Sequence, residues 1–324
     1  MVRLPRGPPR QIACVHLRWR GVIAPHFRKR DPSDDQSCQT LQFGRCVPHT
    51  YGPEFDRVTG AVTSLSTTPA PWRFWFVTER KIRALRGYAS SAFITSIANP
   101  VVYLLALGVG LGSLVPEGVQ GVDYLTFVAP ALLAMSAVFV ANEESTYQVL
   151  VGFRYRPIYI AMNQTPLRGV DIVAGHATFV ALRMAATAGI YLLVVSAFGG
   201  VRQWDALWMV PIATLTGMSI GSVLMAYSAT IVTDKGQLPM IYRLVFVPLF
   251  LFSGTFFPLE QLPIWLQPIG WISPLWHGAE WGRVVSYGAT EPAWLTLVHG
   301  VYLFGVMAVG LILAVRVFTK RLGR

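Results

Sequence analysis

The chain has little cysteine and little charge for its length. Its three cysteines, Cys14, Cys38 and Cys46, lie near the N-terminus, so no disulfide framework holds the remaining residues together. Charged residues make up 13% of the 324 residues, against 53% hydrophobic residues. This composition is outside the usual range of soluble domains, and several windows reach the ~20 apolar residues that cross a ~30 Å hydrocarbon core. We therefore expect a membrane protein.

The sequence also lacks the common catalytic motifs. No phosphate-binding loop of the form GxxxxGK[ST] occurs, so the chain cannot hold ATP in that way, and GxSxG and HExxH are absent too. The segment GVGLG at 108–112 ends an apolar span, where glycines serve helix packing. His16, His26 and His49 lie near the cysteines, but without CxxC or HxxxH spacing. We predict no catalytic residue, no metal and no cofactor on this chain.

Basic residues outnumber acidic ones, giving a net charge of +11. The first 70 residues hold ten of the 27 Lys and Arg and five of the 16 Asp and Glu, so the remainder still carries 17 minus 11, or +6. Those first 70 residues are rich in Pro, Arg, Ser and Thr and have no sustained apolar period. We expect residues 1–70 to be a disordered cytoplasmic extension. Because the other basic residues flank apolar spans, we expect no nucleic-acid partner.

An amphipathic stretch at 71–88 precedes the apolar spans. On a helical wheel, one sector of roughly 100° holds apolar and small residues: Phe74, Trp75, Thr78, Ile82 and Leu85. Basic residues occupy the remainder of the wheel: Arg73, Arg80, Lys81, Arg83 and Arg86. We expect an interfacial helix with aromatic rings at headgroup level and basic residues toward anionic lipid. An ordinary basic flank of the first span is the alternative.

Six apolar segments follow, and we expect each to span the membrane. They lie at about 89–112, 121–141, 170–198, 206–232, 240–257 and 293–318. An even number of spans places both termini on one side. The flanks and loops of that side hold thirteen Lys and Arg, against Arg202 and Arg283 on the other side. The positive-inside rule then makes both termini cytoplasmic. The predicted fold is an all-α membrane protein with a six-span domain at 89–320 and a cytoplasmic tail at 321–324.

The segment between the fifth and sixth spans is apolar but cannot cross the membrane. Residues 256–281 contain four prolines and four tryptophans, which a continuous spanning helix does not tolerate. We expect an extracellular re-entrant segment of short helices that enter the outer leaflet and return. Its candidate residues are Pro258, Glu260, Pro263, His277, Glu280 and Arg283. The last three can form a polar network that seats the segment, and proton coupling is the alternative role.

Arg183 and the inner loop at 142–171 carry the remaining polar signals. If the third span begins near Asp171, Arg183 lies about 18 Å into it. An arginine at that depth costs at least ~2.5–3.5 kcal/mol on insertion scales and faces the bundle interior or a wet cavity. It is either an anchor for an anionic substrate group or part of a dimer-interface network, or it pairs with an internal carboxylate or with helix-end carbonyls. The inner loop is too long for a turn, so it is either a docking surface for another protein or an interfacial helix on lipid.

Several stretches together resemble a known family. They are NPVVYLLALGVGLG (99–112), YLTFVAPALLAMSA (124–137), QTPLRGVDIVAGH (164–176), LFLFSGTFFPLEQLPIWLQ (249–267) and SPLWHGAEWGR (273–283). In this order they are similar to the export-type permease subunits of type-2 ABC transporters. The nearest resemblance is to the nodulation-factor lipooligosaccharide and daunorubicin-resistance permeases, over about residues 72–320.

The resemblance implies the membrane half of an exporter. Two permease subunits, identical or paralogous, would pair with two separate ATPase subunits that hold ATP and Mg²⁺. The segment 143–168 would contain the coupling helix, with Glu143, Glu144, Arg154 and Arg156 as polar contacts of the ATPase. An amphipathic, lipid-linked or drug-like substrate would leave the cytoplasm or inner leaflet across a bacterial-type plasma membrane. An integral-membrane lipid-modifying enzyme is the alternative function.

Overall fold

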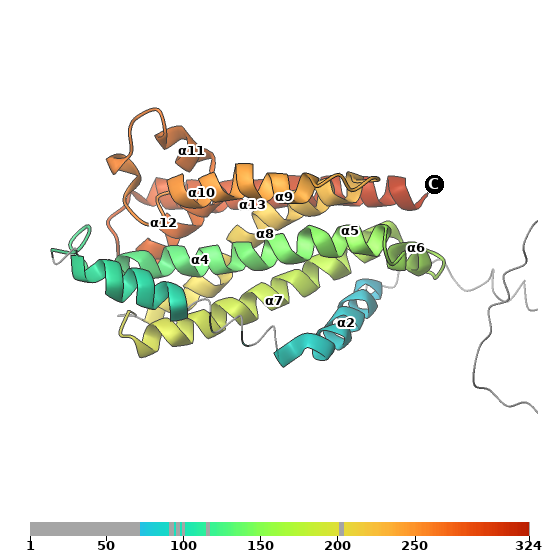
Figure 1. Cartoon of the computed structure of the whole chain (residues 1–324), viewed down its shortest axis with the longest axis horizontal. Helices are drawn as coiled ribbons and strands as arrows, with labels where there is room; N and C mark the ends of the chain where they lie inside the picture. Colours follow the sequence, from blue (N-terminus) through green and yellow to red (C-terminus); the bar gives the residue numbers. More distant parts are fainter. Residues whose placement is uncertain are drawn as a thin grey trace, which may run out of the picture. The chain divides into compact units, whose positions relative to one another are not determined.

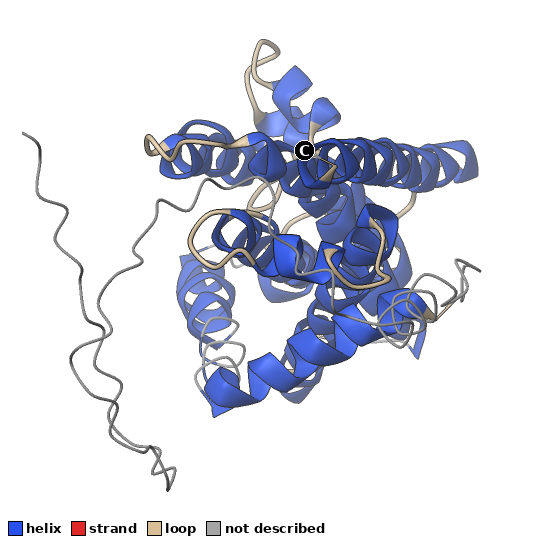
Figure 2. Cartoon of the chain, turned by 90° about the vertical axis from the view of Figure 1, so that its right-hand side faces the viewer, coloured by secondary structure: helices blue, strands red, loops and turns tan. Residues whose placement is uncertain are grey.

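The structure, a computed structural model, describes residues 72–90, 101–114, 117–200 and 204–323, together with Ile94 and Ala98. The chain divides into two units, and all these residues belong to the second, Ser66–Arg324. The predicted extension at 1–70 lies outside the described residues. Within them, regular structure is helical, apart from an isolated antiparallel bridge between Val119 and Val122 (Figure 2).

Among the described residues, four helical rods are long and apolar enough to cross a membrane. The first joins α4 (Tyr124–Ser145) to α5 (Tyr147–Phe153), and the second is α7 (Gly169–Ala197). The third joins η4 (Trp204–Trp208) to α8 (Met209–Thr230), and the fourth is α13 (Ala293–Leu322). They run along a common direction in Figure 1. These rods correspond to the predicted second, third, fourth and sixth spans.

Shorter apolar helices occupy the places of the predicted first and fifth spans. The described part of the first, at 101–114, contains π-helical turns in η2 (Leu104–Leu111) and ends in η3 (Gly112–Leu114). The fifth consists of α9 (Gln237–Ile241), the π-helical η5 (Tyr242–Phe246) and α10 (Val247–Phe252). It ends before the predicted residue 257 because the chain bends at Ser253–Phe257, where Gly254 has a φ of 68°.

Helix α8 lies at the centre of the bundle, packed against α4, α7, α12 and α13. Small residues let these backbones approach one another, as is common between membrane helices. A Cβ at Gly310 of α13 would lie 2.1 Å from Ser222 Oγ and 2.8 Å from the backbone nitrogen of Val223. A side chain at position 310 would therefore push α13 away from α8.

The predicted inner loop is largely helical. Helix α4 continues to Ser145, past the predicted end at 141, and α5 follows almost directly. After a turn, α6 (Ile158–Asn163) completes a helical hairpin with α5. The rings of Phe153, Tyr159 and Phe318 pack with centroids 4.8–5.4 Å apart and fasten this hairpin to α13.

The proline-rich segment forms short helices at the other end of the bundle. They are η6 (Leu259–Gln261), α11 (Gln267–Ile272) and α12 (Pro274–Tyr287). Helix α12 begins at a proline, and Ser273 Oγ accepts a hydrogen bond from the Leu275 backbone N–H at 3.2 Å. It packs tightly on α8, since a Cβ at Gly278 would lie 2.0 Å from Thr216 Oγ1. Figure 1 places α11 and α12 far from α5, α6 and the C-terminus.

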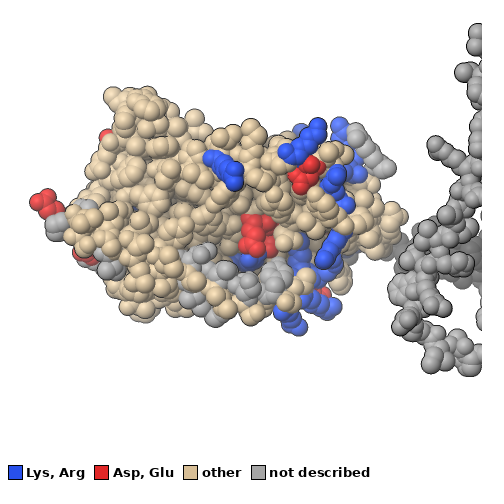
Figure 3. All heavy atoms as spheres, in the orientation of Figure 1, with Lys and Arg blue, Asp and Glu red and all other residues tan. Residues whose placement is uncertain are grey.

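Charged side chains are distributed unevenly along the bundle. Helix α2 (Arg73–Leu85), followed by η1 (Arg86–Tyr88), lies at the same end as α5, α6 and the C-terminus (Figure 1). On the face shown in Figure 3, most Lys and Arg gather at that end, and a broad surface without charge covers much of the rest. The bundle therefore has one basic end and, opposite to it, an end formed by α11 and α12.

Candidate functional site

Helix α2 is seated directly on α7. A Cβ at Gly175 would lie 2.3 Å from the backbone oxygen of Phe74, so glycine is needed for this approach. Thr78 is fully buried and donates a hydrogen bond to the Gly175 oxygen at 2.9 Å. In the predicted apolar sector, Thr78 is therefore covered by protein, whereas Trp75 is 44% exposed. Its neighbour Phe76 is 65% exposed.

The helical wheel predicted that Lys81 would face lipid, but in the structure its side chain points into the protein. Its side chain is 13% exposed, and its Nζ lies 3.4 Å from Glu144 Oε2. Burial lowers the pKa of the Lys81 ammonium group to about 8, although the Glu144 carboxylate opposes this effect. Of the other basic residues predicted on this stretch, Arg80, Arg83 and Arg86 are exposed, and Arg73 is half-buried. The wheel could not identify the exception because it does not show which face α7 covers.

Arg183, near the middle of α7, reaches the same carboxylates. Its Nη2 lies 2.8 Å from Glu143 Oε2, and its Nη1 donates a hydrogen bond to Glu144 Oε1. The side chains of Arg183 and Glu144 are 10% and 2% exposed, whereas that of Glu143 is 55% exposed. Two cations and two carboxylates thus form a neutral set, which we call the buried charge cluster: Lys81, Glu143, Glu144 and Arg183. This is the internal pairing that one of the interpretations of Arg183 expects.

The buried charge cluster joins three elements, α2, α4 and α7. Glu144 lies one residue before the end of α4, and Thr146 alone separates α4 from α5. A movement of the α5–α6 hairpin must therefore displace Glu144. Because separating buried ions leaves unpaired charges in a medium of low dielectric constant, Arg183 and Lys81 should follow that displacement. The cluster is suited to transmitting a rigid-body movement from the hairpin into the bundle.

The turn between α5 and α6 forms a polar surface together with the connection from α8 to α9. Arg154 Nη1 donates a hydrogen bond to the Val232 oxygen at 2.5 Å, and Tyr155 Oη donates one to Asp234 Oδ2 at 3.2 Å. Arg156 is exposed beside them. We call Arg154, Tyr155, Arg156 and Asp234 the hairpin surface. The predicted coupling residues Arg154 and Arg156 lie together here, and sequence reasoning missed Asp234 because it follows a different helix.

At the other end of the bundle, Arg283 fastens α12 to its neighbours. Its side chain is fully buried, with Nη1 2.6 Å from Glu280 Oε1 and Nη2 2.7 Å from the Gly254 oxygen. The guanidinium carbon lies 3.9 Å from the centroid of the Phe127 ring of α4. Burial raises the pKa of the Glu280 carboxyl group, and Arg283 opposes that shift. Arg283 therefore links α12 to α4 and to the bend after α10.

The remaining predicted residues of the external segment are spread over its surface and interior. Pro258 precedes η6 and is buried, Glu260 lies within η6 and is exposed, and Pro263 follows it. The sequence suggested that His277 would form a polar network with Glu280 and Arg283, but it has another partner. Its Nδ1 lies 2.6 Å from His299 Nδ1 on α13, a partner that spacing along the chain could not reveal.

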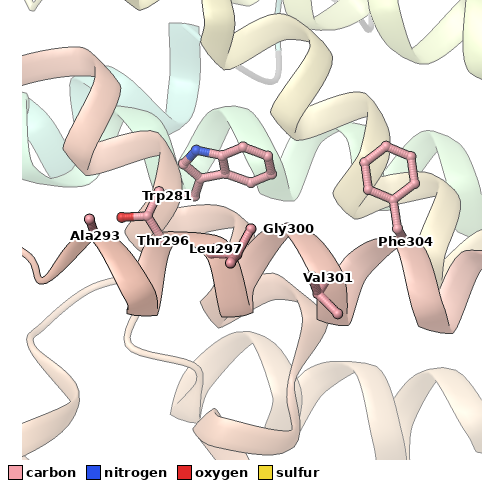
Figure 4. A pocket seen from close by; sticks show the side chains of 7 residues that line it. All are labelled: Trp281, Ala293, Thr296, Leu297, Gly300, Val301 and Phe304. Carbon is pink, nitrogen blue, oxygen red and sulfur yellow. The ribbon is translucent and has the colours of Figure 1, made fainter.

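An apolar groove of about 680 Å³ lies between α12 and α13. Trp281 of α12 and Phe304 of α13 stand at either side of Gly300 (Figure 4). Leu297 and Val301 line it too and are mostly exposed, so the groove opens away from the bundle. Apart from Thr296, its lining is apolar or aromatic and suits contact with acyl chains.

No metal site is evident in the part of the chain that the structure describes. There, no group of three or more His, Cys, Asp or Glu could hold a metal ion. Cys14, Cys38 and Cys46, whose neighbouring histidines lack metal-binding spacing, lie outside the described residues. The candidate functional site therefore consists of the buried charge cluster together with the hairpin surface.

Comparisons with known proteins agree with the resemblance that the sequence stretches indicated. The family model described as ABC-2 type transporter matches residues 73–287. Nodulation protein J of Rhizobium leguminosarum bv. viciae is 30% identical over 262 residues, which cover 80% of this chain and 98% of that protein. Nodulation protein J of Rhizobium leguminosarum bv. trifolii is 33% identical over 227 residues, covering 69% and 86%. That of Rhizobium meliloti (strain 1021) is 30% identical over 220 residues, covering 67% and 82%.

Proposed function

The chain belongs to the ABC-2 type transporter family, and we propose that it is the permease subunit of an exporter driven by a separate ATPase subunit. Family membership makes it an integral membrane component of a transporter, and members of this family work with ABC ATPases in general. The observation that carries the proposal is the connection between an exposed hairpin surface and a buried charge cluster. It gives an external motor a place to act on the bundle.

The hairpin surface is the docking site that we assign to the ATPase. Arg154 and Arg156 are exposed and basic, and Asp234 adds a carboxylate beside them. The hairpin is packed against α13 through Phe153 and Tyr159, so it is suited to move as a rigid body. Glu144, being buried, would act inside the chain and not as a direct contact of the ATPase.

A transport cycle follows from this arrangement. Closure of the ATPase dimer on ATP would push the hairpin and, through Glu144, shift Arg183 on α7 and Lys81 on α2 together. Such a movement would open the interface between two permease subunits toward the outside, as a hinge or shear of packed helices. Stronger substrate binding by the inward state than by the outward state would set the direction of transport.

The proposed topology has six spans, with both termini in the cytoplasm of a bacterial-type cell. The basic end of the bundle, visible in Figure 3, would face the cytoplasm according to the positive-inside rule. Helix α2 would lie at that interface with its exposed Trp72, Trp75 and Phe76 among the lipid headgroups. Helices α11 and α12 would form the external re-entrant segment.

The substrate that we propose is amphipathic, either lipid-linked or drug-like. The bundle neutralises its internal charges in pairs, as in Arg283 with Glu280, and many of its outward-facing side chains are apolar. A path along such helices favours a molecule with a large apolar part. The second permease subunit would be a further copy of this chain or a paralogue.

Affinity purification of the tagged full chain from its own host tests the proposal. Mild detergent extraction followed by mass spectrometry should recover an ATPase with a phosphate-binding loop in near-equal amount. Recovery of the chain alone, in a detergent that keeps known ABC transporters assembled, would overturn the proposed function and favour the lipid-modifying enzyme.

A further inference from the structure

A chain of hydrogen bonds crosses the end of the bundle that carries α11 and α12. His277 Nε2 lies 3.0 Å from the Trp271 backbone oxygen, and His277 Nδ1 lies 2.6 Å from His299 Nδ1. His299 Nε2 lies 2.9 Å from Glu291 Oε1, just before α13. We call His277 and His299 the outer histidine pair. It links the end of α11, α12 and α13 through side chains.

The outer histidine pair is shielded from solvent. His299 is fully buried, and the ring of Trp276 lies edge-on to both imidazoles, with centroids 4.9 and 5.2 Å away. The Tyr302 ring stacks on His277 at 4.1 Å. Glu291, whose side chain is 13% exposed, is the most exposed of the three side chains that these hydrogen bonds join. The contacts are therefore made in a dry environment, where an unmade hydrogen bond is costly.

The hydrogen-bond partners determine how many hydrogens the two histidine rings and the Glu291 carboxyl group must hold together. A carbonyl oxygen only accepts, so His277 Nε2 carries a hydrogen toward Trp271. One hydrogen must lie between His299 and Glu291, either on the imidazole or on the carboxyl group. One further hydrogen must lie between the two Nδ1 atoms, because two bare nitrogens 2.6 Å apart would repel each other. The three contacts therefore need three hydrogens, whereas two neutral imidazoles and an ionised Glu291 carry only two. The site holds one excess proton.

We propose that the outer histidine pair and Glu291 form a binding site for one proton, and that this proton fastens α12 to α13. Loss of the proton would leave His299 with a single hydrogen, which the ionised Glu291 carboxylate would hold on Nε2, so that two bare Nδ1 atoms would face each other. A second added proton would place two N–H groups face to face. The contact between α12 and α13 is therefore strongest when the site holds this one proton. It is weakened when the site loses that proton or takes up a second one.

The position of the bound proton follows from the surroundings of the two rings. Burial, together with the neighbouring His299, lowers the pKa of His277 to about 4, so the His277 ring stays neutral near pH 7. The excess proton then belongs to His299 and Glu291, and His299 Nδ1–H donates to the bare His277 Nδ1. Glu291 provides both the counter-charge and the route by which the proton exchanges with solvent.

Other ionisable groups around α12 are few and leave this site neutral. Within the described residues, the ionisable groups at this end of the bundle are Glu280, Arg283 and Tyr287 on α12 itself, Glu260 on η6, Asp205 on η4, Asp123 and Tyr124 at the start of α4, and Tyr302 on α13. Those toward the far ends of the elements packed on α12 are Glu143 and Glu144 on α4, Tyr227 on α8, and Arg316, Lys320 and Arg321 on α13. Arg283 and Glu280 neutralise each other. The other cations of the described elements packed on α12 lie toward the far end of α13, so none replaces the proton between the histidine rings.

Stability measured against pH tests the proposal on the full chain in lipid nanodiscs. An unfolded imidazole titrates near pH 6.5. Below that pH the unfolded chain takes up a proton that folded His277 refuses, so stability falls as pH drops from about 6.5 toward 4. Above it, loss of the bound proton breaks the contact between the rings, so stability falls again. The wild-type unfolding midpoint should peak near pH 6.5 and drop by several degrees at pH 4.5 and 9.

His299→Asn is the decisive variant. Its amide Nδ2 takes the place of the His299 Nδ1 and donates to His277 without titrating, so the decline above pH 6.5 should disappear. Glu260→Gln, an exposed carboxylate outside the chain of hydrogen bonds, is the matched control and should keep the wild-type profile. A wild-type midpoint without a maximum, or a decline above pH 6.5 that His299→Asn retains, would overturn the proposal.

Nitrogen NMR of histidine-labelled wild-type chain gives a second test that needs no variant to fold. At pH 7 the His277 Nδ1 atom should be bare and the His299 Nδ1 atom should carry a hydrogen, whether the other hydrogen of the site lies on His299 Nε2 or on the Glu291 carboxyl group. Bare Nδ1 atoms on both rings, with both Nε2 atoms protonated, would mean that no excess proton is bound and would refute the assignment.

Discussion

Replacing Glu144 by Gln removes the negative charge at the centre of the buried charge cluster. The glutamine amide keeps nearly the same shape and one accepting oxygen. Lys81, 13% exposed, loses its carboxylate, and Arg183 keeps only Glu143, whose side chain is 55% exposed. Removing one partner of a buried ion pair costs about 3–5 kcal/mol. Because Gln still accepts a hydrogen bond, we expect a loss of about 3 kcal/mol in the free energy of unfolding.

The assay is equilibrium unfolding of the full chain in bicelles, with a double-mutant cycle. Glu143→Gln is the control, since an exposed pair contributes about 1 kcal/mol or less. Combining Glu144→Gln with Lys81→Met removes the stranded cation, so the double variant should recover part of the loss, with a coupling energy of about 1–3 kcal/mol. A Glu144→Gln variant no less stable than Glu143→Gln, or additive effects of the two changes, would refute the reasoning.

Three further predictions concern the seating of α2 and α12. Gly175→Val should displace α2 from α7, because a Cβ there meets the Phe74 backbone, and proteolysis within α2 should become faster; an unchanged cleavage rate would contradict the packing. Burial lowers the pKa of Lys81 to about 8, whereas the unfolded chain holds this proton to about pH 10.5, so stability from this group rises with pH between these values. The rise should be absent from Lys81→Met, and equal pH slopes would argue against burial. Arg283→Met strands Glu280 and should cost about 3–5 kcal/mol, of which adding Glu280→Gln should restore part; a loss below 1 kcal/mol would be inconsistent with the buried pair.

Hydropathy along the sequence was sufficient to place the long rods. Windows of ~20 apolar residues identify a spanning helix because the bilayer requires that length, and α7 and α13 begin and end near the predicted limits. The short helices of the proline-rich segment followed from proline itself, which starts helices and interrupts them. Helix α10 ends early because of the bend at Gly254, a local backbone event that composition does not reveal.

The candidate site could be predicted only in part, because its contacts join distant positions. The depth of Arg183 in an apolar span indicated that it needed a partner, but Glu143 and Glu144 were assigned to a loop that is helical in the structure. The helical wheel gave the right period for α2 and the wrong environment for Lys81. His299 lay unnoticed in an apolar span because its partner His277 belongs to another helix.

The central claim is that an ATPase docks on the hairpin surface and acts on the bundle from there. The most direct measurement is co-purification of the ATPase with the tagged full chain carrying Arg154→Glu and Arg156→Glu. Arg316→Glu with Lys320→Glu, on the exposed face at the end of α13, is the matched control with the same change in charge. We predict that the hairpin variant loses the ATPase while both variants insert into the membrane as well as wild type. Equal recovery of the ATPase by the hairpin variant and the control would contradict the account.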